Sequence, residues 1–188
     1  MLRPLSLAFR LALPLLAACA PAPDERIAVP RTASEETQRI AHPTVALRGV
    51  SLPSYAAGEA IFTADGGGRL LDSGAILWAD DPSRAVTLEL TRHLTQITGA
   101  RVASEPWPFL DLASAEIEVR IEEMLARADG RFHLSGQYFV TSETATDRAR
   151  LFDLTTPIAG ERTPEEIAAA RARVVRDLAL DMVRRGLR

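Results

Sequence analysis

The residue with the clearest chemistry in this 188-residue chain is its single cysteine, Cys19. It ends the run LAAC (16–19), which follows a short apolar stretch near the N-terminus. The small side chains of Ala17 and Ala18 fit the cleft of a signal peptidase, and a cysteine thiol at this position can take a diacylglyceryl group. We therefore predict a lipoprotein signal peptide over residues 1–18, cleavage between Ala18 and Cys19, and a lipid-anchored mature N-terminus at Cys19.

A plain secretory leader is the alternative, because the apolar core from Leu11 to Leu16 is short and contains Pro14. Cys19 would then be an ordinary small apolar residue. We favour lipidation because the one cysteine of the chain lies where the modification requires it.

A lipid anchor would fix the membrane to which the folded part of the chain is attached. Each buried methylene contributes about 0.8 kcal/mol, so several acyl chains hold a protein in one leaflet. No later stretch approaches the roughly 20 consecutive apolar residues of a spanning helix, and we expect a periplasmic body. Ala20 follows Cys19 where an aspartate would signal retention in the inner membrane, which favours the outer membrane.

The histidines and carboxylates that could bind a metal or act as acid and base form no motif with a suitable spacing. The histidines His42, His93 and His133 have no ligand spacing between them, so we predict no metal site. Glu116 and Glu118 share one face of a predicted strand, where paired carboxylates could act as acid and base, but a solvated sheet face is the simpler explanation. We predict no cofactor and no enzymatic activity.

Composition indicates one domain of ordinary size without a nucleic-acid partner. The net charge is −3, without long charged runs, and all 22 basic residues are arginine. About 170 residues remain after the signal peptide, enough for a single core. Residues 19–43 are rich in Ala, Pro, Thr, Glu and Arg without apolar periodicity, so we predict a flexible tether there and a folded domain over residues 44–188.

Short strands open the folded part. Apolar residues predict a strand over 44–52, and residues 61–63 and 69–72 flank the turn DGGG (65–68) as a hairpin. Three consecutive glycines can also cradle a phosphate, but no helix start and no Lys-Ser/Thr pair follows them. Ser54 lacks the flanking glycines of a hydrolase nucleophile.

A helix is predicted from Asp81-Pro82 to Gly99, because aspartate caps exposed amides and proline suits the first helical position. Its core stripe consists of Val86, Leu90, Leu94 and Ile97. A neighbouring face of low charge consists of Thr87, Leu88, Thr91 and Thr95. This face is our candidate for a subunit interface, with a singly exposed leucine as the alternative.

The second half is more regular. Period-two alternation predicts antiparallel strands over 115–122, 132–140 and 149–154. A helix is predicted from Thr163-Pro164 to Gly186, with Ile167, Val174, Leu178 and Met182 facing inward. The predicted fold class is α+β: a sandwich of a mixed or antiparallel sheet with two main helices packed on it.

Three motifs follow one another along this body: GVSLPSY (49–55), LWAD (77–80) and PW (106–107). Together with the cysteine at the leader, they resemble the PqiC-type auxiliary lipoprotein family of ABC-linked transport systems, from about Val45 to the C-terminal helix. The motif residues to which this resemblance gives structural roles are Pro53, Tyr55, Trp78 and Trp107. The two tryptophans would cap the core, with the lining of a lipid groove as the alternative.

The resemblance implies an outer-membrane lipoprotein that works with a mammalian-cell-entry-type protein and its permease and ATPase to move lipid between membranes. Its role would be non-catalytic docking or gating, with subunits repeated in a homo-oligomeric ring. The chain departs from the family pattern at 80–83 and 56–58, which concerns partner contacts. The alternatives are a structural envelope lipoprotein that binds other outer-membrane proteins without transport, and a periplasmic hydrolase with a pocket of convergent polar groups.

Overall fold

A computed structural model describes residues 25–188, so the predicted cleavage and lipidation site at Ala18 and Cys19 lies outside the described residues. Three long antiparallel strands form the largest unit: β6 (Ala115–Ala126), β7 (Arg131–Thr141) and β8 (Arg148–Pro157). Along β6 and β7 buried and accessible residues alternate, which is the period-two pattern seen in the sequence. The three predicted strands are confirmed.

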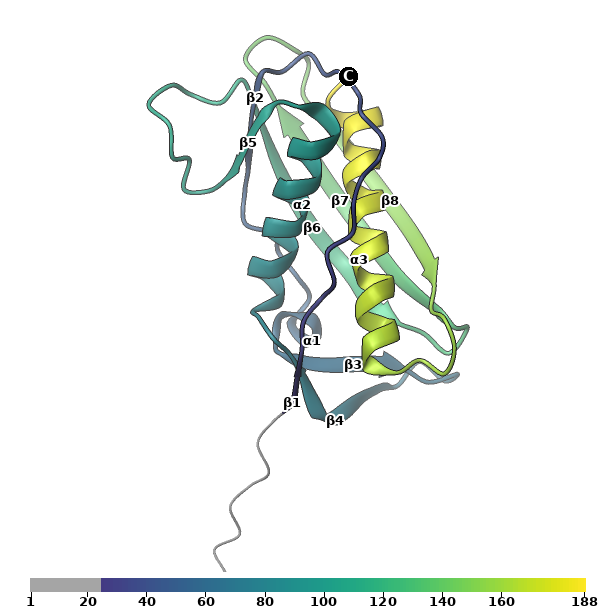
Figure 1. Cartoon of the computed structure of the whole chain (residues 1–188). Coiled ribbons are helices and arrows are strands. Elements are labelled where there is room, and N and C mark those ends of the chain that lie inside the picture. The colour runs from purple at the N-terminus through teal and green to yellow at the C-terminus, as the bar shows by residue number, and fades with distance from the viewer. Residues whose placement is uncertain (1–24) are drawn as a thin grey trace, which may run out of the picture.

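The sheet is mixed because shorter strands add to this unit in parallel. β2 (Thr44–Leu47) lies parallel to both β6 and β5 (Arg101–Ser104). β3 (Ala60–Ala64) and β4 (Leu70–Trp78) form the predicted hairpin, and β1 (Glu25–Ile27) pairs in parallel with β4. The eight strands make one mixed sheet, which curls around the helices (Figure 1).

A bulge in β6 contributes to this curl. The register between β6 and β7 shifts between Ile121 and Glu123, opposite Gly136. A Cβ atom on Gly136 would lie 2.2 Å from the carbonyl oxygen of Arg120, so the two backbones approach as closely as only a glycine permits. Bulges of this kind increase the twist of the strand that carries them.

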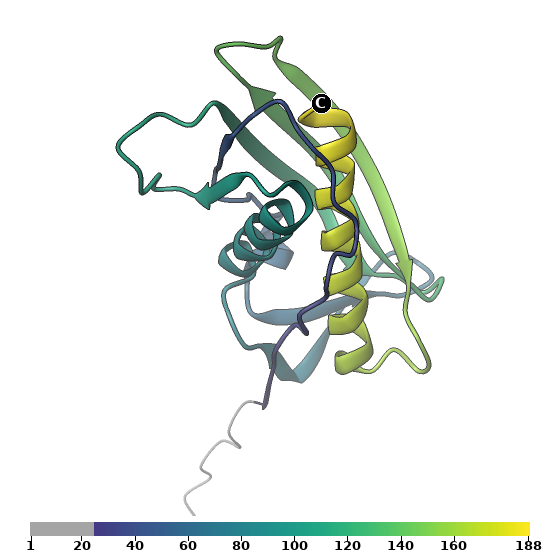
Figure 2. The same ribbon diagram turned by 45° about the horizontal axis from the view of Figure 1, so that its top comes forward.

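Two long helices lie on one face of the sheet (Figures 1 and 2). α2 (Pro82–Thr98) begins after Asp81, whose carboxylate accepts a hydrogen bond from the amide of Arg84, and ends at Gly99 in the left-handed conformation. Both ends of the helix are therefore where the sequence predicts them.

The other long helix, α3 (Pro164–Asp181), begins with a capping box between Thr163 and Glu166 and continues into the π-helical turn η1 (Met182–Gly186). A single turn, α1 (Ser54–Ala57), follows Pro53. All residues predicted to face inward from α2 and α3 are at most 3% exposed; they are Val86, Leu90, Leu94, Ile97, Ile167, Val174, Leu178 and Met182. The predicted fold class, with two main helices packed on a mixed sheet, is confirmed.

Residues 28–43 form an extended segment, here called the strap, that crosses the surface of α2 and α3 (Figure 1). Its amide at Gln38 donates to the carbonyl oxygen of Ile97 at 2.7 Å, and Val29 and Ile40 pack against the core. The predicted flexible tether is therefore wrong for β1 and the strap. The segment has no apolar periodicity because it lies across two helices instead of forming an element of its own.

The predicted strand over 44–52 is also shorter than expected, since β2 ends at Leu47. Beyond it the chain still follows β6, through hydrogen bonds from the amides of Arg48 and Ser51 to the carbonyls of Ile117 and Val119. These bonds are too widely spaced to form a continuous ladder, so the chain can turn away into α1.

A buried ion pair connects the two long helices. Arg171 of α3 is 1% exposed, and its Nη2 donates to Glu89 Oε1 of α2 at 3.1 Å. The guanidinium also lies over the ring of Trp78 at the end of β4, 4.8 Å from the ring centroid. Burial raises the pKa of Glu89 and lowers the pKa of Arg171, while their mutual attraction opposes both shifts.

Removing the cation alone should destabilise the fold strongly. Arg171→Met leaves the Glu89 carboxylate buried without its partner, which typically costs about 3–5 kcal/mol of unfolding free energy. The double variant Arg171→Met/Glu89→Leu replaces the pair by apolar side chains and should recover most of this loss. Urea unfolding followed by circular dichroism gives the unfolding free energies of the wild type, of Arg171→Met, of Glu89→Leu and of the double variant. Simple addition of the two single effects in the double variant would contradict the pairing.

His93 makes stability depend on pH. The side chain is 1% exposed, and burial is the main cause that lowers its pKa from 6.5 to about 4, followed by the nearby charges of Arg92 and Arg176. The unfolded chain takes up this proton near pH 6.5 and the folded chain only near pH 4, so this contribution to stability is complete above pH 6.5 and is lost as the pH falls towards 4.

Between pH 7 and pH 5 we therefore expect His93 to remove about 2 kcal/mol of unfolding free energy. His93→Gln should show a correspondingly flatter pH dependence in urea unfolding. The raised pKa of Glu89 makes the unfolding free energy change with pH in the opposite direction. This contribution is present in both proteins, so it cancels when their pH dependences are compared. Measurements at pH 8 give the effect of the substitution itself, and equal slopes for the two proteins below pH 7 would refute the assignment.

Candidate functional site

Three of the four motif residues have structural positions. The hydroxyl of Tyr55 accepts a hydrogen bond from the amide of Met124 at 3.1 Å, and its ring meets Phe62 edge to face. The carbonyl of Pro53 accepts the amides that close α1, and Trp78 is 5% exposed against Arg171. These three residues thus join α1, β4 and β6 to the core.

The fourth motif residue, Trp107, lies in the loop between β5 and β6, which projects to the upper left of the molecule in Figure 1. Its indole N–H donates to the carbonyl of Asp111 at 2.7 Å, and its ring meets Phe109 edge to face with centroids 4.9 Å apart. Asp111 also pairs with Arg101 at 2.7 Å. The loop is thus closed by its own contacts, and Trp107 is half-buried within it.

The predicted interface residues lie on α2 with different exposures. Thr87 is buried, and its hydroxyl donates to the carbonyl of Ser83 and accepts from the amide of Val50. Thr91 and Thr95 each donate to a carbonyl one turn earlier in the helix. Leu88 is 40% exposed. The outward part of this face therefore consists of Leu88 with Thr91 and Thr95, while Thr87 belongs to the packing below it.

A hollow of about 220 Å³ lies between this face and the strap. Its lining includes Val29 of the strap, Leu88 and Arg92 of α2, and the Trp78–Arg171 contact. The buried pair of Arg171 and Glu89 thus forms part of the wall of a surface hollow, and this pair is not among the residues that the sequence predicts for function. The available signal is that Arg171 falls on the inward stripe of α3, four residues after Ile167.

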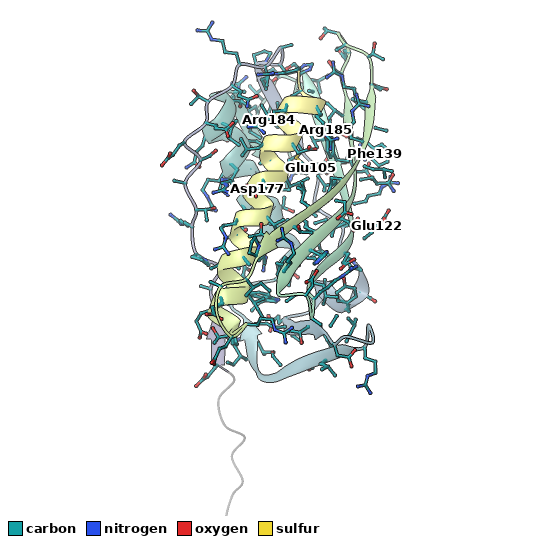
Figure 3. The ribbon with its side chains drawn as sticks, turned by 90° about the vertical axis from the view of Figure 1, so that its right-hand side faces the viewer. Glu105, Glu122, Phe139, Asp177, Arg184 and Arg185 are labelled. Carbon is teal, nitrogen blue, oxygen red and sulfur yellow. The ribbon has the colours of Figure 1, made fainter. Side chains whose placement is uncertain are left out.

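A second hollow, of about 860 Å³, separates the strap from α3. Figure 3 shows Asp177, Arg184 and Arg185 along this side of the helix. Arg184 pairs with Glu36 of the strap at 2.5 Å, and Arg185 pairs with Asp181 at 2.7 Å. The Arg184–Glu36 pair fastens the strap to the helix, whereas the Arg185–Asp181 pair lies within the C-terminal helix. An exposed pair such as Arg184–Glu36 contributes little to stability by itself.

Glu116 and Glu118 lie on the sheet face turned away from the helices. Arg48 pairs with Glu116 and lies 3.6 Å from Glu118. Glu118 also pairs with Arg120, whose guanidinium lies over the ring of Phe139. Both carboxylates thus belong to an exposed network of ion pairs, which is what a solvated sheet face predicts.

The other residues weighed for chemistry are apart from one another. Within residues 25–188, no group of three His, Cys, Asp or Glu side chains could hold a metal ion. The Asp65 carboxylate accepts the amides of Gly67 and Arg69, so it fastens the glycine turn of the β3–β4 hairpin. None of the helices in this part of the chain is long and apolar enough to cross a membrane.

The outer edge of the sheet at β8 is covered by arginines. Four carbonyls of alternate β8 residues each accept a hydrogen bond from a guanidinium: Ala149 from Arg150, Leu151 from Arg185, Thr155 from Arg131 and Pro157 from Arg173. The donor–acceptor distances range from 2.8 to 3.3 Å. This strand pairs with β7 on its inner side.

Comparison with known proteins agrees with this architecture. The chain is similar to an uncharacterized protein of known structure, with a TM-score of 0.69 and 19% identity over 85% of this chain and 98% of the other. A structure from Xanthomonas campestris gives a TM-score of 0.58 and 11% identity over 86% and 90% of the two chains. At these identities the similarity shows the fold.

No curated protein matches the chain. The family described as "ABC-type transport auxiliary lipoprotein component" matches residues 27–183, which include the last residue of β1, the strap and nearly all of the folded body. The chain therefore belongs to the family of ABC-type transport auxiliary lipoprotein components.

Proposed function

We propose that this protein is an outer-membrane lipoprotein, anchored through Cys19, that serves as the non-catalytic docking subunit of an ABC-linked lipid transport system. The family match over residues 27–183 carries the proposal. The LAAC sequence supports a lipid anchor, and Ala20 in place of an aspartate supports the outer membrane. The PqiC-like motifs support a mammalian-cell-entry-type protein, with its permease and ATPase, as the partner.

The described structure is consistent with a role in binding. Its motif residues are used for packing, and its exposed carboxylates at Glu116 and Glu118 are engaged by arginines. The features that remain for function are surfaces: the outer face of α2 and the projecting loop between β5 and β6, which carries the exposed Leu110 and Leu112. A structural envelope lipoprotein is the second candidate, because such surfaces could equally hold another outer-membrane protein.

Purification of the tagged full chain from native membranes tests this function. We expect the wild type to fractionate with the outer membrane and to bring along components of one ABC transport system, identified by mass spectrometry. Cys19→Ala should leave the protein out of the membrane fraction, because the acyl chains that hold it are missing. An unmodified wild-type N-terminus would refute the anchor, and a wild type that brings along only outer-membrane proteins would support the second candidate.

The outer face of α2 is our proposed contact between copies of this chain. Leu88→Asp places a charge at the exposed leucine and should dissociate a ring of subunits, because a buried unpaired carboxylate is strongly unfavourable. Gln96→Asp is the matched control, since Gln96 is exposed on the same helix but turned by roughly 80°. Light scattering of the purified protein measures the mass, and an oligomer that survives Leu88→Asp would exclude this face.

A further inference from the structure

The loop between β5 and β6 holds two leucines in solvent. Leu110 and Leu112 are 108% and 82% exposed, and Phe109 beside them is 38% exposed. A single exposed leucine is ordinary on a protein surface, but adjacent large apolar side chains on one projecting loop indicate a binding surface. We call residues 105–114 the apolar loop.

The apolar loop is rigid enough to act as a preformed knob. Besides the Trp107–Asp111 hydrogen bond, the guanidinium of Arg101 lies 4.6 Å from the ring centroid of Phe109. The base of the loop is fastened on both sides: the amide of Glu105 donates to the carbonyl of Leu47, and Ser114 exchanges hydrogen bonds with Thr44. A surface that is already ordered loses little entropy when it binds.

The charge around the apolar loop indicates the chemistry of its partner. A hollow of about 460 Å³ beside Leu112 is lined by four carboxylate residues, which are Glu105, Glu116, Glu143 and Asp147. Arg48 pairs with Glu116 and lies 3.8 Å from Glu105, so the excess negative charge of this hollow comes from Glu143 and Asp147. An anionic lipid surface would be repelled by this arrangement, whereas a protein with arginine or lysine around an apolar socket would be attracted.

The apolar loop also lies at the end of the molecule opposite to β1 (Figures 1 and 2). Residues 20–25 can span at most about 20 Å, so an anchor at Cys19 holds the β1 end close to the membrane. The body that separates the two ends includes α3 and η1, which together extend about 30 Å. An upright body would therefore direct the apolar loop into the periplasm.

From these observations we infer that the apolar loop is the docking knob for the periplasmic protein of the transport system, and that it enters an apolar socket bordered by basic residues. This inference rests on the proposed function. Leu110 and Leu112 fill the socket, while the neighbouring carboxylates orient the approach and exclude acidic surfaces.

Paired leucine substitutions at the two ends of the molecule test the inference. Leu110→Ser/Leu112→Ser should reduce the transporter components that co-purify with the full lipidated chain by about tenfold or more. The matched control is Leu70→Ser/Leu71→Ser, which removes two leucines, 40% and 48% exposed, from the β3–β4 hairpin at the opposite end. This control should keep the complex, and thermal unfolding of both variants shows that each is folded.

The results separate the inference from the proposed function. If the wild type brings along no transporter component, the proposed function fails and the docking fails with it. If the wild type binds the transporter and Leu110→Ser/Leu112→Ser binds it equally well, only the docking inference is overturned. A photo-crosslinking side chain at position 110 should join the transport protein, and crosslinks to lipid or to another copy of this chain would overturn the inference.

Charge gives an independent readout. Glu143→Gln removes one carboxylate from the hollow without changing the apolar loop. We expect it to slow association with the transport protein several-fold at low salt and to leave association at high salt nearly unchanged. An association rate that changes with neither salt nor this substitution would contradict the inference that basic residues surround the socket.

Discussion

The buried pair between Arg171 and Glu89 is the constraint that the rest of the arrangement depends on. Two charges out of water are tolerable only when their geometry fixes each against the other, so α2 and α3 must meet at one register. Trp78 lies against the same guanidinium and thereby brings the end of β4 to the helices. The strap then crosses this junction, and β1 joins β4 beside it. This contact thus joins the two helices to the end of the β3–β4 hairpin, and the N-terminal segment lies beside the junction.

Much of the architecture could be predicted because local sequence rules agree with the fold. Asp81 and Thr163 are N-cap residues whose side-chain oxygens mark the starts of the two long helices. The alternation of apolar and polar residues along 115–122 predicts a half-buried strand. β1 and β5 were missed because each has three or four residues, and such short segments become strands only through a parallel neighbour that lies far away in sequence. The strap forms no helix or strand of its own and is held by contacts with α2 and α3, so its sequence carries no periodic signal.

For the site, sequence reasoning located important residues but could not assign their roles by itself. The sequence predicts that both Trp78 and Trp107 cap the core, yet of the two only Trp78 is buried, while Trp107 stabilises a projecting loop. No periodic rule describes a loop that is closed by its own side chains, so the exposure of Leu110 emerges only in three dimensions. The lipidation of Cys19, in contrast, depends on enzymes that recognise the linear sequence around the cysteine and not on the fold, and it stays a prediction.

The arginines along β8 limit how copies of this protein could assemble. An open strand normally offers its free carbonyls to any second strand that approaches, which is the first step towards a shared sheet or a fibre. Here the carbonyls of Leu151 and Thr155 already hold cationic partners, so an incoming backbone would have to displace them before it could pair. Association by continuing the sheet at β8 is therefore disfavoured, and a second copy that approached this edge would have to recognise it through side chains, so each copy would stay a separately folded unit there.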